Sequence, residues 1–281
     1  MKVRMRCTLK NIVLSLALLA FSAPALAGWR DVTNLPAAVS DAVAAAVDDG
    51  LYVMSGAPGQ GLRQFFEFYD TKNDGWRPLT PMPANLWRFS LTAGNGQLFV
   101  IGGRDQATGD MSSDVWMYTP QSAIWVELPA LPQARAGHAS FFADGNVYVI
   151  GGVGEKNDRV LRYVSRLGRW EIVGAAMPEP VANAAWTKKG DLLIVAGGVG
   201  ANGRDSKSVQ AFNIQTLKWS RLAALPQASS GGALGVVDGA LHYAGGFSQS
   251  AQKVLSRHMR YNSKIWRDLD AMPQGRHQMA Y

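Results

Sequence analysis

The stretch AGHASFFADGNVYVIGG, residues 136–152, contains the features that decide the fold of this 281-residue chain. Two runs of apolar and small residues flank an Asp-Gly pair, which is a strong local signal for a tight hairpin. The second run, VYVI, ends at the glycine pair 151–152. We therefore interpret the stretch as two antiparallel strands followed by a glycine-rich bend.

The same pattern recurs along the chain with a period of about 47 residues. A glycine pair, or Ser-Gly in the first copy, lies at 55–56, 102–103, 151–152, 197–198 and 245–246. A tryptophan recurs at Trp29, Trp76, Trp125, Trp170, Trp219 and Trp266, and a Leu-Pro or Met-Pro follows each of them. Self-similarity at this length indicates an array of equivalent structural units.

Each copy has the pattern of four short strands. The first two form the hairpin described above, the third carries an aromatic residue such as Tyr118 or Tyr163, and the tryptophan begins the fourth. No window places apolar residues at helical spacing over three turns, which indicates an all-β chain. Four strands per repeat suit the blade of a β-propeller, in which sheets are arranged radially around an axis.

The glycine pair, the aromatic residue and the tryptophan keep one register and resemble the kelch repeat family over residues 28–281. The first copy departs from the pattern, because Ser55 replaces the first glycine. The resemblance implies a kelch-type β-propeller with five complete four-stranded blades. These blades are expected at about 37–83, 84–132, 133–178, 179–226 and 227–273.

Segments near the two ends match parts of a sixth blade. Residues 28–36 are expected to form a closing outer strand, and residues 274–281 the start of an incomplete blade. We therefore expect a six-bladed ring that is truncated at its C-terminus and has an exposed seam. The alternative is a five-bladed ring with spare strands at both ends. Arg276 follows a Pro-Gln pair as Arg135 does, which favours the six-bladed interpretation.

Residues 1–27 have the pattern of a signal peptide. A basic segment precedes a short apolar run, and the small residues Ala25 and Ala27 form a cleavage site. We expect a periplasmic or secreted protein that begins near Gly28 and has no transmembrane segment after cleavage. The net charge of +7 falls to +3 without the leader, and the remaining charge does not indicate nucleic-acid binding.

The single cysteine, Cys7, lies in the leader, so the mature chain can form no disulfide, thiolate metal site or cysteine nucleophile. Copper enzymes similar to galactose oxidase share the kelch fold and need a tyrosine cross-linked to a cysteine, which excludes that activity. The mature sequence contains no H-E-x-x-H, C-x-x-C or G-x-S-x-G motif. We therefore expect no metal and no cofactor.

The loops that precede the first strands and follow the second strands of a propeller form one face, on which ligands bind. Arginine and tryptophan are frequent in these loops and could hold an anionic sugar or a carboxylate by charge and stacking. The candidate ligand-binding residues are Arg63, Trp87, Arg88, Arg104, Asp105, His138, Trp186 and Arg204. The alternative is that they are solvated loop residues. We expect Arg135 and Arg276 to be structural braces.

No complete catalytic set is present, so we interpret the chain as an exported binding module for a protein or a glycan. The alternative is a periplasmic sugar mutarotase, because residues 194–209 and 231–246 resemble the N-acetylneuraminate epimerase family. A mutarotase needs an acid/base pair that opens and recloses the sugar ring. The resemblance places the functional arginine of that family on Arg204, whereas the expected glutamate falls on Gly198.

Overall fold

The computed structural model describes residues 29, 31–39, 41–56 and 65–278. The chain divides into two units, residues 1–30 and 31–281, and all described strands belong to the second unit. The predicted signal peptide, residues 1–27, and the candidate site residue Arg63 lie outside the described residues. Within the described ranges, no helix is long and apolar enough to cross a membrane.

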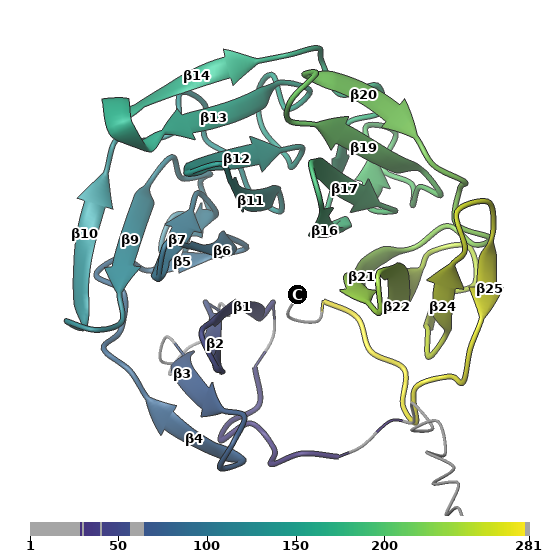
Figure 1. Ribbon diagram of the computed structural model, residues 1–281, viewed down its shortest axis with the longest axis horizontal. Coiled ribbons are helices and arrows are strands. Elements are labelled where there is room, and N and C mark those ends of the chain that lie inside the picture. The colour runs from purple at the N-terminus through teal and green to yellow at the C-terminus, as the bar shows by residue number, and fades with distance from the viewer. Residues whose placement is uncertain (1–28, 30, 40, 57–64, 279–281) are drawn as a thin grey trace, which may run out of the picture. The chain divides into compact units, whose positions relative to one another are not determined.

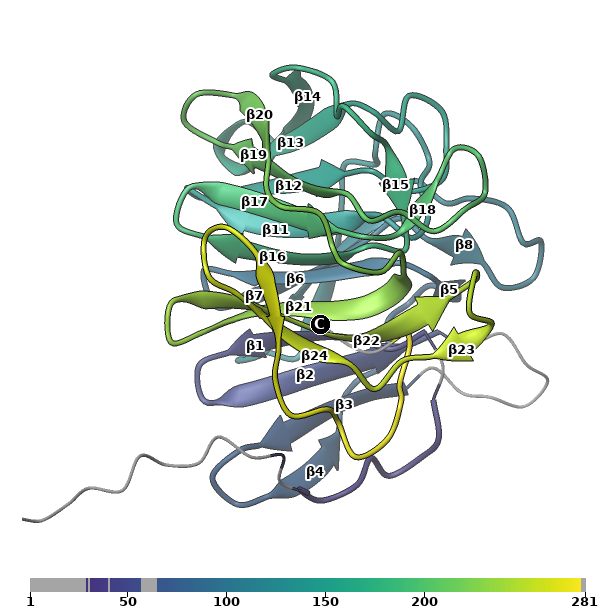
Figure 2. The same ribbon diagram turned by 90° about the vertical axis from the view of Figure 1, so that its right-hand side faces the viewer.

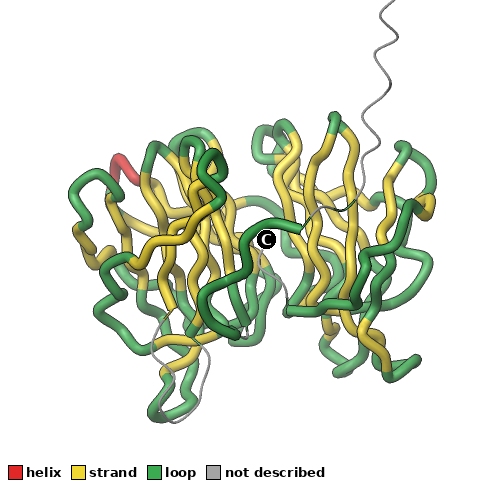
Figure 3. The backbone as a smooth tube through the Cα atoms, turned by 90° about the horizontal axis from the view of Figure 1, so that it is seen from below, coloured by secondary structure: helices red, strands yellow, loops and turns green. Residues whose placement is uncertain are grey.

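The second unit is all-β, and its one described helical element is a turn of 3₁₀ helix, η1 (Ser165–Leu167). Five antiparallel sheets with four main strands each are arranged around a central axis (Figure 1), which confirms the predicted propeller blades. In each blade the chain runs from an inner strand near the axis to an outer strand at the rim. Figure 3 shows the strands running between two faces that are made of loops.

The strands of the five blades follow one another in sequence order. Blade 1 contains β1 (Val43–Val47), β2 (Gly50–Ser55), β3 (Phe65–Asp70) and β4 (Gly75–Pro78). Blade 2 contains β6 (Ser90–Gly94), β7 (Gln97–Ile101), β9 (Val115–Thr119) and β10 (Ile124–Leu128). Blade 3 contains β11 (Ala139–Ala143), β12 (Asn146–Ile150), β13 (Val160–Val164) and β14 (Arg169–Val173). Blade 4 contains β16 (Ala185–Lys189), β17 (Leu192–Ala196), β19 (Val209–Asn213) and β20 (Lys218–Arg221). Blade 5 contains β21 (Ser230–Val237), β22 (Ala240–Ser248), β24 (His258–Tyr261) and β25 (Trp266–Asp268).

Short pairings extend one end of the blades. β5 (Leu86–Trp87) pairs with β8 (Arg104–Asp105), and β15 (Val181–Ala182) pairs with β18 (Val199–Gly200). In blade 5, β23 (Lys253–Val254) pairs with the end of β22. These elements lie at the same end of the unit (Figure 2), so they build up the face on which the sequence predicts ligand binding.

The predicted hairpin turns between first and second strands are confirmed. Asn95-Gly96, Asp144-Gly145 and Asp238-Gly239 have positive φ at both positions. This left-handed geometry is that of the type I′ turn, which Asn-Gly and Asp-Gly favour. The turns fix the register of the strands that they join.

The hydrophobic core is divided among the gaps between neighbouring blades. Between blades 1 and 2, for example, Met54 and Phe66 pack with Leu91, Leu98 and Val100. Equivalent clusters fill the gaps between blades 2 and 3, 3 and 4, and 4 and 5. We call the side of a blade that packs on the next blade in the chain its forward face. Each blade is thus stabilised by apolar burial against its neighbours.

The glycine pairs allow neighbouring blades to meet backbone to backbone. Gly102 has a φ of 56°, and a Cβ atom at this position would lie 2.6 Å from the carbonyl oxygen of Arg135 in the next blade. The N–H of Gly103 donates to the same carbonyl at 2.7 Å. Gly152 donates in the same way to Val181, and Gly198 to Ser229. Both the positive φ and the close approach explain why the repeat carries glycine here.

The tryptophans of the five blades, Trp76 to Trp266, link neighbouring copies of the repeat at the outer rim. Each indole packs beside the aromatic residue of its own third strand, as Trp125 does with Tyr118 at 4.8 Å between ring centroids. Each indole N–H also donates to a carbonyl of the preceding unit, a bond that the sequence does not predict. The five pairs are Trp76 with Thr33, Trp125 with Thr80, Trp170 with Pro129, Trp219 with Ala175 and Trp266 with Ala223, at 2.7–3.0 Å.

Residues 28–36 were expected to form an outer strand, but the described part, 31–36, contains no strand. The segment still follows the path of one, because Thr33 accepts the Trp76 indole and its N–H donates to Asp74 Oδ1 at 2.9 Å. A strand needs a hydrogen-bonded neighbour, and no strand of the described residues pairs with this segment. The predicted outer strand is therefore not confirmed for residues 31–36.

The last described residues repeat a contact that other blades make with the blade before them. Gly246 donates to the carbonyl of Arg276 at 2.9 Å, as Gly198 does to Ser229. Residues 276–278 are nevertheless not in a strand, and residues 279–281 lie outside the described residues. The predicted partial sixth blade, 274–281, is therefore not confirmed.

Candidate functional site

Six residues surround the axis: five lie where the first strands of the blades begin, and the sixth lies at the end of the described residues. All six have positive φ and recur at the spacing of the repeat: Asp41, Arg88, Gly137, Asn183, Gly231 and Gln278. From Arg88 onward, each successive residue donates its backbone N–H to the carbonyl of the one before, at 2.7–3.0 Å. We call these six residues the belt. Its hydrogen bonds fix the backbone from which the side chains project.

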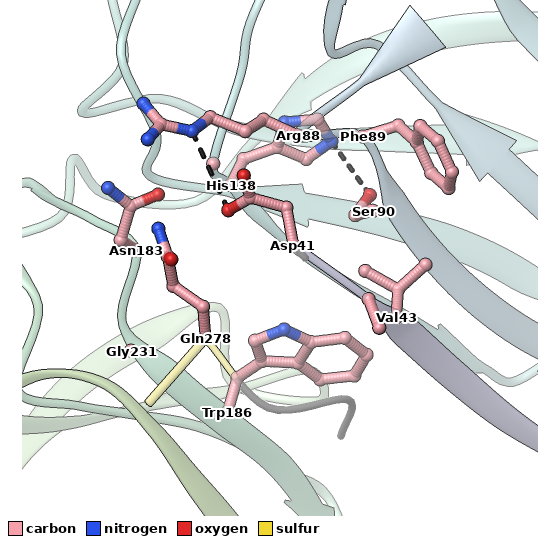
Figure 4. A pocket seen from close by; sticks show the side chains of 12 residues that line it. Asp41, Val43, Arg88, Phe89, Ser90, His138, Asn183, Trp186, Gly231 and Gln278 are labelled. Atoms are coloured by element: carbon pink, nitrogen blue, oxygen red, sulfur yellow. Dashed lines mark hydrogen bonds and ion pairs between the residues drawn. The ribbon is translucent and has the colours of Figure 1, made fainter. Parts of the chain in front are cut away.

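All belt residues line one pocket near the axis, which we call the mouth (Figure 4). The pocket is open to solvent, and the roughly 490 Å³ of unfilled space within it includes part of that solvent. Figure 4 shows the side chains of Asp41, Arg88, Asn183 and Gln278 grouped on one side of Trp186. The other lining residues are Ala42, Val43, Phe89, Ser90 and His138. A few polar groups beside an aromatic wall are typical of a ligand site.

Asp41 and Arg88 form the charged centre of the mouth. Arg88 Nε lies 3.7 Å from Asp41 Oδ1, which is close enough for an ion pair but too long for a hydrogen bond. Burial raises the pKa of Asp41, and the positive charges of Arg88 and His277 oppose that rise. The guanidinium also lies over the ring of Trp87, 4.7 Å from its centroid. Because Arg88 makes no bidentate bond to Asp41, its donors can serve a ligand.

Trp87, Arg104 and Asp105 lie beside the mouth, on the β5–β8 pairing. Trp87 and Arg104 are paired in register across the two strands. The Arg104 guanidinium donates to the carbonyl of Gly109 at 2.7 Å. The Asp105 carboxylate accepts two backbone N–H groups of its own loop, which hold the pKa of Asp105 below its ordinary range. Arg104 and Asp105 therefore order their own loop.

His138 contributes to the mouth but lies deep between blades 2 and 3. Its Nε2 is 2.8 Å from Ser90 Oγ, and both side chains are buried. Burial, assisted by the positive charge of Arg135, lowers the pKa of His138 to about 3. The imidazole is therefore neutral near pH 7 and acts as a polar link between the two blades.

Trp186 and Arg204 occupy contrasting positions. Trp186 forms a wall of the mouth and packs edge-on against Phe141, with ring centroids 4.9 Å apart. Arg204 is exposed in a turn that is closed by the N–H of Gly200, and it does not line the mouth. Gly198, where the mutarotase resemblance requires a glutamate, is one of the buried glycines between blades. The acid/base pair that the resemblance implies therefore lacks its carboxylate.

Arg135 is a structural brace, as its position in the sequence suggests. It is fully buried, and its guanidinium donates to the carbonyls of Gly151, Lys156 and Arg159 at 2.9–3.3 Å. Burial lowers the pKa of Arg135 to about 10. Arg276, in the same register position, is exposed. The two arginines therefore differ in role although their sequence contexts are alike.

Asp41, Ser90 and Gln278 are mouth residues that the sequence interpretation missed. Asp41 belongs to the degenerate first copy, and Gln278 lies at the far end of the repeat pattern. Both occupy the register position of Arg88, so an alignment of the repeats on that residue would have found them.

Comparisons with known proteins agree with the fold. Residues 89–280 match the model of the KLHDC2/KLHL20/DRC7 Kelch-repeats domain. Kelch-like protein 41a of Danio rerio is 29% identical over 205 residues, which cover 72% of this chain and 34% of that protein. Kelch-like protein 40 of Xenopus tropicalis is 28% identical over 206 residues, with 72% and 33% coverage. The chain thus spans about a third of the length of these relatives.

A solved structure is also similar. It is titled "Structure of YjhT" and superposes with a TM-score of 0.77 at 22% sequence identity, covering 88% of each chain. At this level of identity the likeness concerns the fold.

Proposed function

Because the chain belongs to the kelch-repeat family, we propose that it is a binding module whose ligand, a protein segment or a glycan, docks at the mouth. The observation that carries the proposal is the convergence of charged and amide side chains on one open pocket beside an indole. These side chains are Asp41, Arg88, Asn183, Gln278 and Trp186. The blades hold the loops of this face in place, which suits recognition.

The mouth offers groups that suit both ligand classes. The guanidinium of Arg88 donates to carboxylates or hydroxyls, and the carboxylate of Asp41 accepts from hydroxyls or amines. The carboxamides of Asn183 and Gln278 can do both. The ring of Trp186 provides apolar surface for a sugar ring or a side chain. A ligand with several polar groups and one flat apolar face would match this arrangement.

Two arginine variants test the mouth as the binding site. A glycan array and a displayed peptide library would be probed with the native chain, with Arg88→Ala and with Arg204→Ala. Both arginines belong to the loop face, but only Arg88 lines the mouth. Ligands selected by the native chain should lose about tenfold or more in affinity with Arg88→Ala, and should bind Arg204→Ala normally. Equal binding by all three proteins would contradict the proposal.

A second proposal is sugar mutarotase activity. It is supported by the resemblance of residues 194–209 and 231–246 to the N-acetylneuraminate epimerase family and by the fold likeness to YjhT. The test is NMR of the anomer ratio of freshly released N-acetylneuraminate. Acceleration that Arg204→Ala abolishes would support the activity, and a rate equal to that of buffer would exclude it.

We also propose that the ring has six blade positions. Arg276 accepts the bond from Gly246 that marks the start of a blade, and Gln278 continues the belt by donating to Gly231 at 2.7 Å. Thr33 takes the place of an outer-strand end, since it accepts the Trp76 indole. These contacts mark the inner and outer ends of a blade position between blades 5 and 1 (Figure 1). A crystal structure in which β1 packs directly on blade 5 would contradict this proposal.

The leader supports a further proposal, namely export from the cytoplasm. Expression of the full chain in a Gram-negative host should give a periplasmic protein whose mass corresponds to a start at Gly28. Recovery of the uncleaved chain in the cytoplasmic fraction would contradict export.

A further inference from the structure

The forward face of blade 5 differs chemically from the other forward faces. In blade 4, Ile194 and Val209 on this face are buried against blade 5. In blade 5 the same two positions hold His242 and His258, and both side chains are half-buried. The equivalent pairs in blades 2 and 3 are Phe99 with Val115 and Tyr148 with Val160, all of them buried. Blade 5 therefore presents two titratable rings where other blades present apolar side chains.

The two histidines form a directed chain of hydrogen bonds. His258 Nδ1 lies 3.3 Å from the backbone carbonyl oxygen of Asp270, which can only accept, so Nδ1 carries a hydrogen. In the neutral ring the Nε2 of His258 is then an acceptor. It lies 3.0 Å from His242 Nδ1, which therefore donates to it. These two hydrogen bonds link β22, β24 and the segment after β25.

Protonation changes this chain in two steps. One added proton can be accommodated, because a cationic ring still donates to a neutral one. A second proton leaves two N–H donors facing each other at the 3.0 Å separation, with no acceptor between them. The bond between the rings is then lost and replaced by repulsion between two positive charges.

Neighbouring charges make the second proton less favourable. Arg260 is paired with His242 across the strands, and Arg267 is paired with Arg260. Burial, then the charges of His258 and Arg260, lower the pKa of His242, against a smaller opposing effect of Asp238. The charged or titratable residues around the pair are Asp238, Lys253, Arg257, Arg260, Arg267, Asp268 and Asp270, and Arg257 is neutralised by a bidentate ion pair with Asp268.

We propose that His242 and His258 form a proton switch that loosens blade 5 on acidification. At neutral pH their hydrogen bonds tie the second and third strands of the blade to the segment beyond the fourth. At acid pH a second proton on the pair places two cationic rings beside Arg260, and the hydrogen bond between His242 and His258 is lost. The switch alters the forward face of blade 5, and neither His242 nor His258 lines the mouth.

Hydrogen exchange with mass spectrometry tests the switch blade by blade. Protection factors, corrected for intrinsic exchange rates, would be measured at pH 7 and pH 5 in the native chain and in His242→Tyr/His258→Val, which carries the residues of blade 3. In the native chain, amides of β22 and β24 should lose about tenfold or more in protection, and in the variant less than about threefold. Amides of β17 and β19 in blade 4 are the internal control, because global acid destabilisation lowers protection in every blade. Equal losses in both proteins, or in blades 4 and 5, would overturn the proposal.

A second variant keeps the test decisive if the double variant does not fold. In His258→Gln the carboxamide can accept from His242 and donate to the carbonyl of Asp270 without titrating near neutral pH. After correction by the blade 4 control, blade 5 protection in this variant should fall less than about threefold between pH 7 and pH 5, because burial and Arg260 still act on His242. A pH dependence equal to that of the native chain would overturn the switch.

Discussion

At their inner ends, neighbouring blades contact one another through backbone atoms on both sides. At the outer rim, a tryptophan side chain of one blade contacts the backbone before it. The carbonyl of Arg135 receives the N–H of Gly103 and lies 2.6 Å from where a Cβ of Gly102 would be. At the rim, Trp125 reaches the carbonyl of Thr80 through its indole at 3.0 Å. A backbone contact cannot adjust to an added atom, while a side chain can change its torsions. The inner contact therefore restricts residue identity more strongly than the outer one.

The two ends of the blades tolerate variation differently for this reason. The carbonyls that accept the indoles belong to residues as different as Thr80, Pro129 and Ala175, because any residue supplies a backbone carbonyl. The inner contacts repeat glycine in four of the five copies, and only the first copy has a serine at one position. Substitutions at the inner end should therefore cost more than those at the rim.

Gly102→Ala should have the largest effect. The new Cβ would collide with the Arg135 carbonyl oxygen, and alanine is disfavoured at a φ of 56°. We expect the free energy of unfolding to fall by about 3–5 kcal/mol, or the chain to fail to fold. Gly190→Ala is the matched control, because Gly190 has a φ of 57° and no atom lies within 4 Å of its Cβ position. This control should lose only about 1 kcal/mol in denaturant unfolding, and equal losses would show that the close approach is unimportant.

Arg135→Leu should have the next largest effect. It removes the donor from three carbonyls in the interior, at the point where blade 3 begins. We expect a loss of about 3 kcal/mol, measured by the same unfolding experiment. Arg276→Leu changes the exposed arginine of the same register position and should cost less than about 0.5 kcal/mol. Similar values for the two variants would refute the assignment of Arg135 as a brace.

Acid should weaken the contact between blades 2 and 3 through His138. Its pKa of about 3 in the folded chain lies below the ordinary value of 6.5, so the unfolded chain binds the proton more readily. The stability that neutral His138 contributes to the folded chain is present in full above pH 6.5 and is lost as the pH falls toward 3. At pH 5 the loss is about 2 kcal/mol.

The variant Ser90→Ala/His138→Phe isolates this effect from other titrations. The variant exchanges equivalent residues between blades 2 and 3. Position 90 receives the alanine that blade 3 has at Ala139, and position 138 receives the phenylalanine that blade 2 has at Phe89. The free energy of unfolding of the variant should depend less on pH between 6.5 and 4 than that of the native chain. Identical pH profiles would show that His138 does not govern the acid response.

The contacts at the two ends of the blades explain how much of the fold the sequence predicts. Glycine and tryptophan serve contacts that recur in every copy, so their period predicted the blades and their order. The segment 31–36 was expected to be a strand because WRDVTNLP resembles other fourth strands. Strand formation depends on a neighbour, however, and a local pattern does not reveal one.

The site was less predictable because the belt fixes a backbone conformation and not a residue type. Aspartate, arginine, asparagine, glutamine and glycine all occupy belt positions with positive φ. Asp41 therefore carried no recognisable signal, although it pairs with the predicted site residue Arg88. The sequence makes His138 a ligand candidate, and its buried role becomes apparent only through Ser90, which lies 48 residues earlier in the chain.

Trp219→Phe tests the outer rim and should have the smallest effect of the substitutions that disrupt a contact. Phenylalanine retains most of the packing beside Phe212 but loses the indole N–H that donates to the carbonyl of Ala175 at 3.0 Å. The loss should be about 1 kcal/mol in the free energy of unfolding. Trp116→Phe is the control, because the buried indole N–H of Trp116 has no acceptor among the described residues and its removal sacrifices no hydrogen bond. Equal losses in Trp116→Phe and Trp219→Phe would show that the size of the ring, and not the hydrogen bond to the preceding blade, makes tryptophan necessary at the rim.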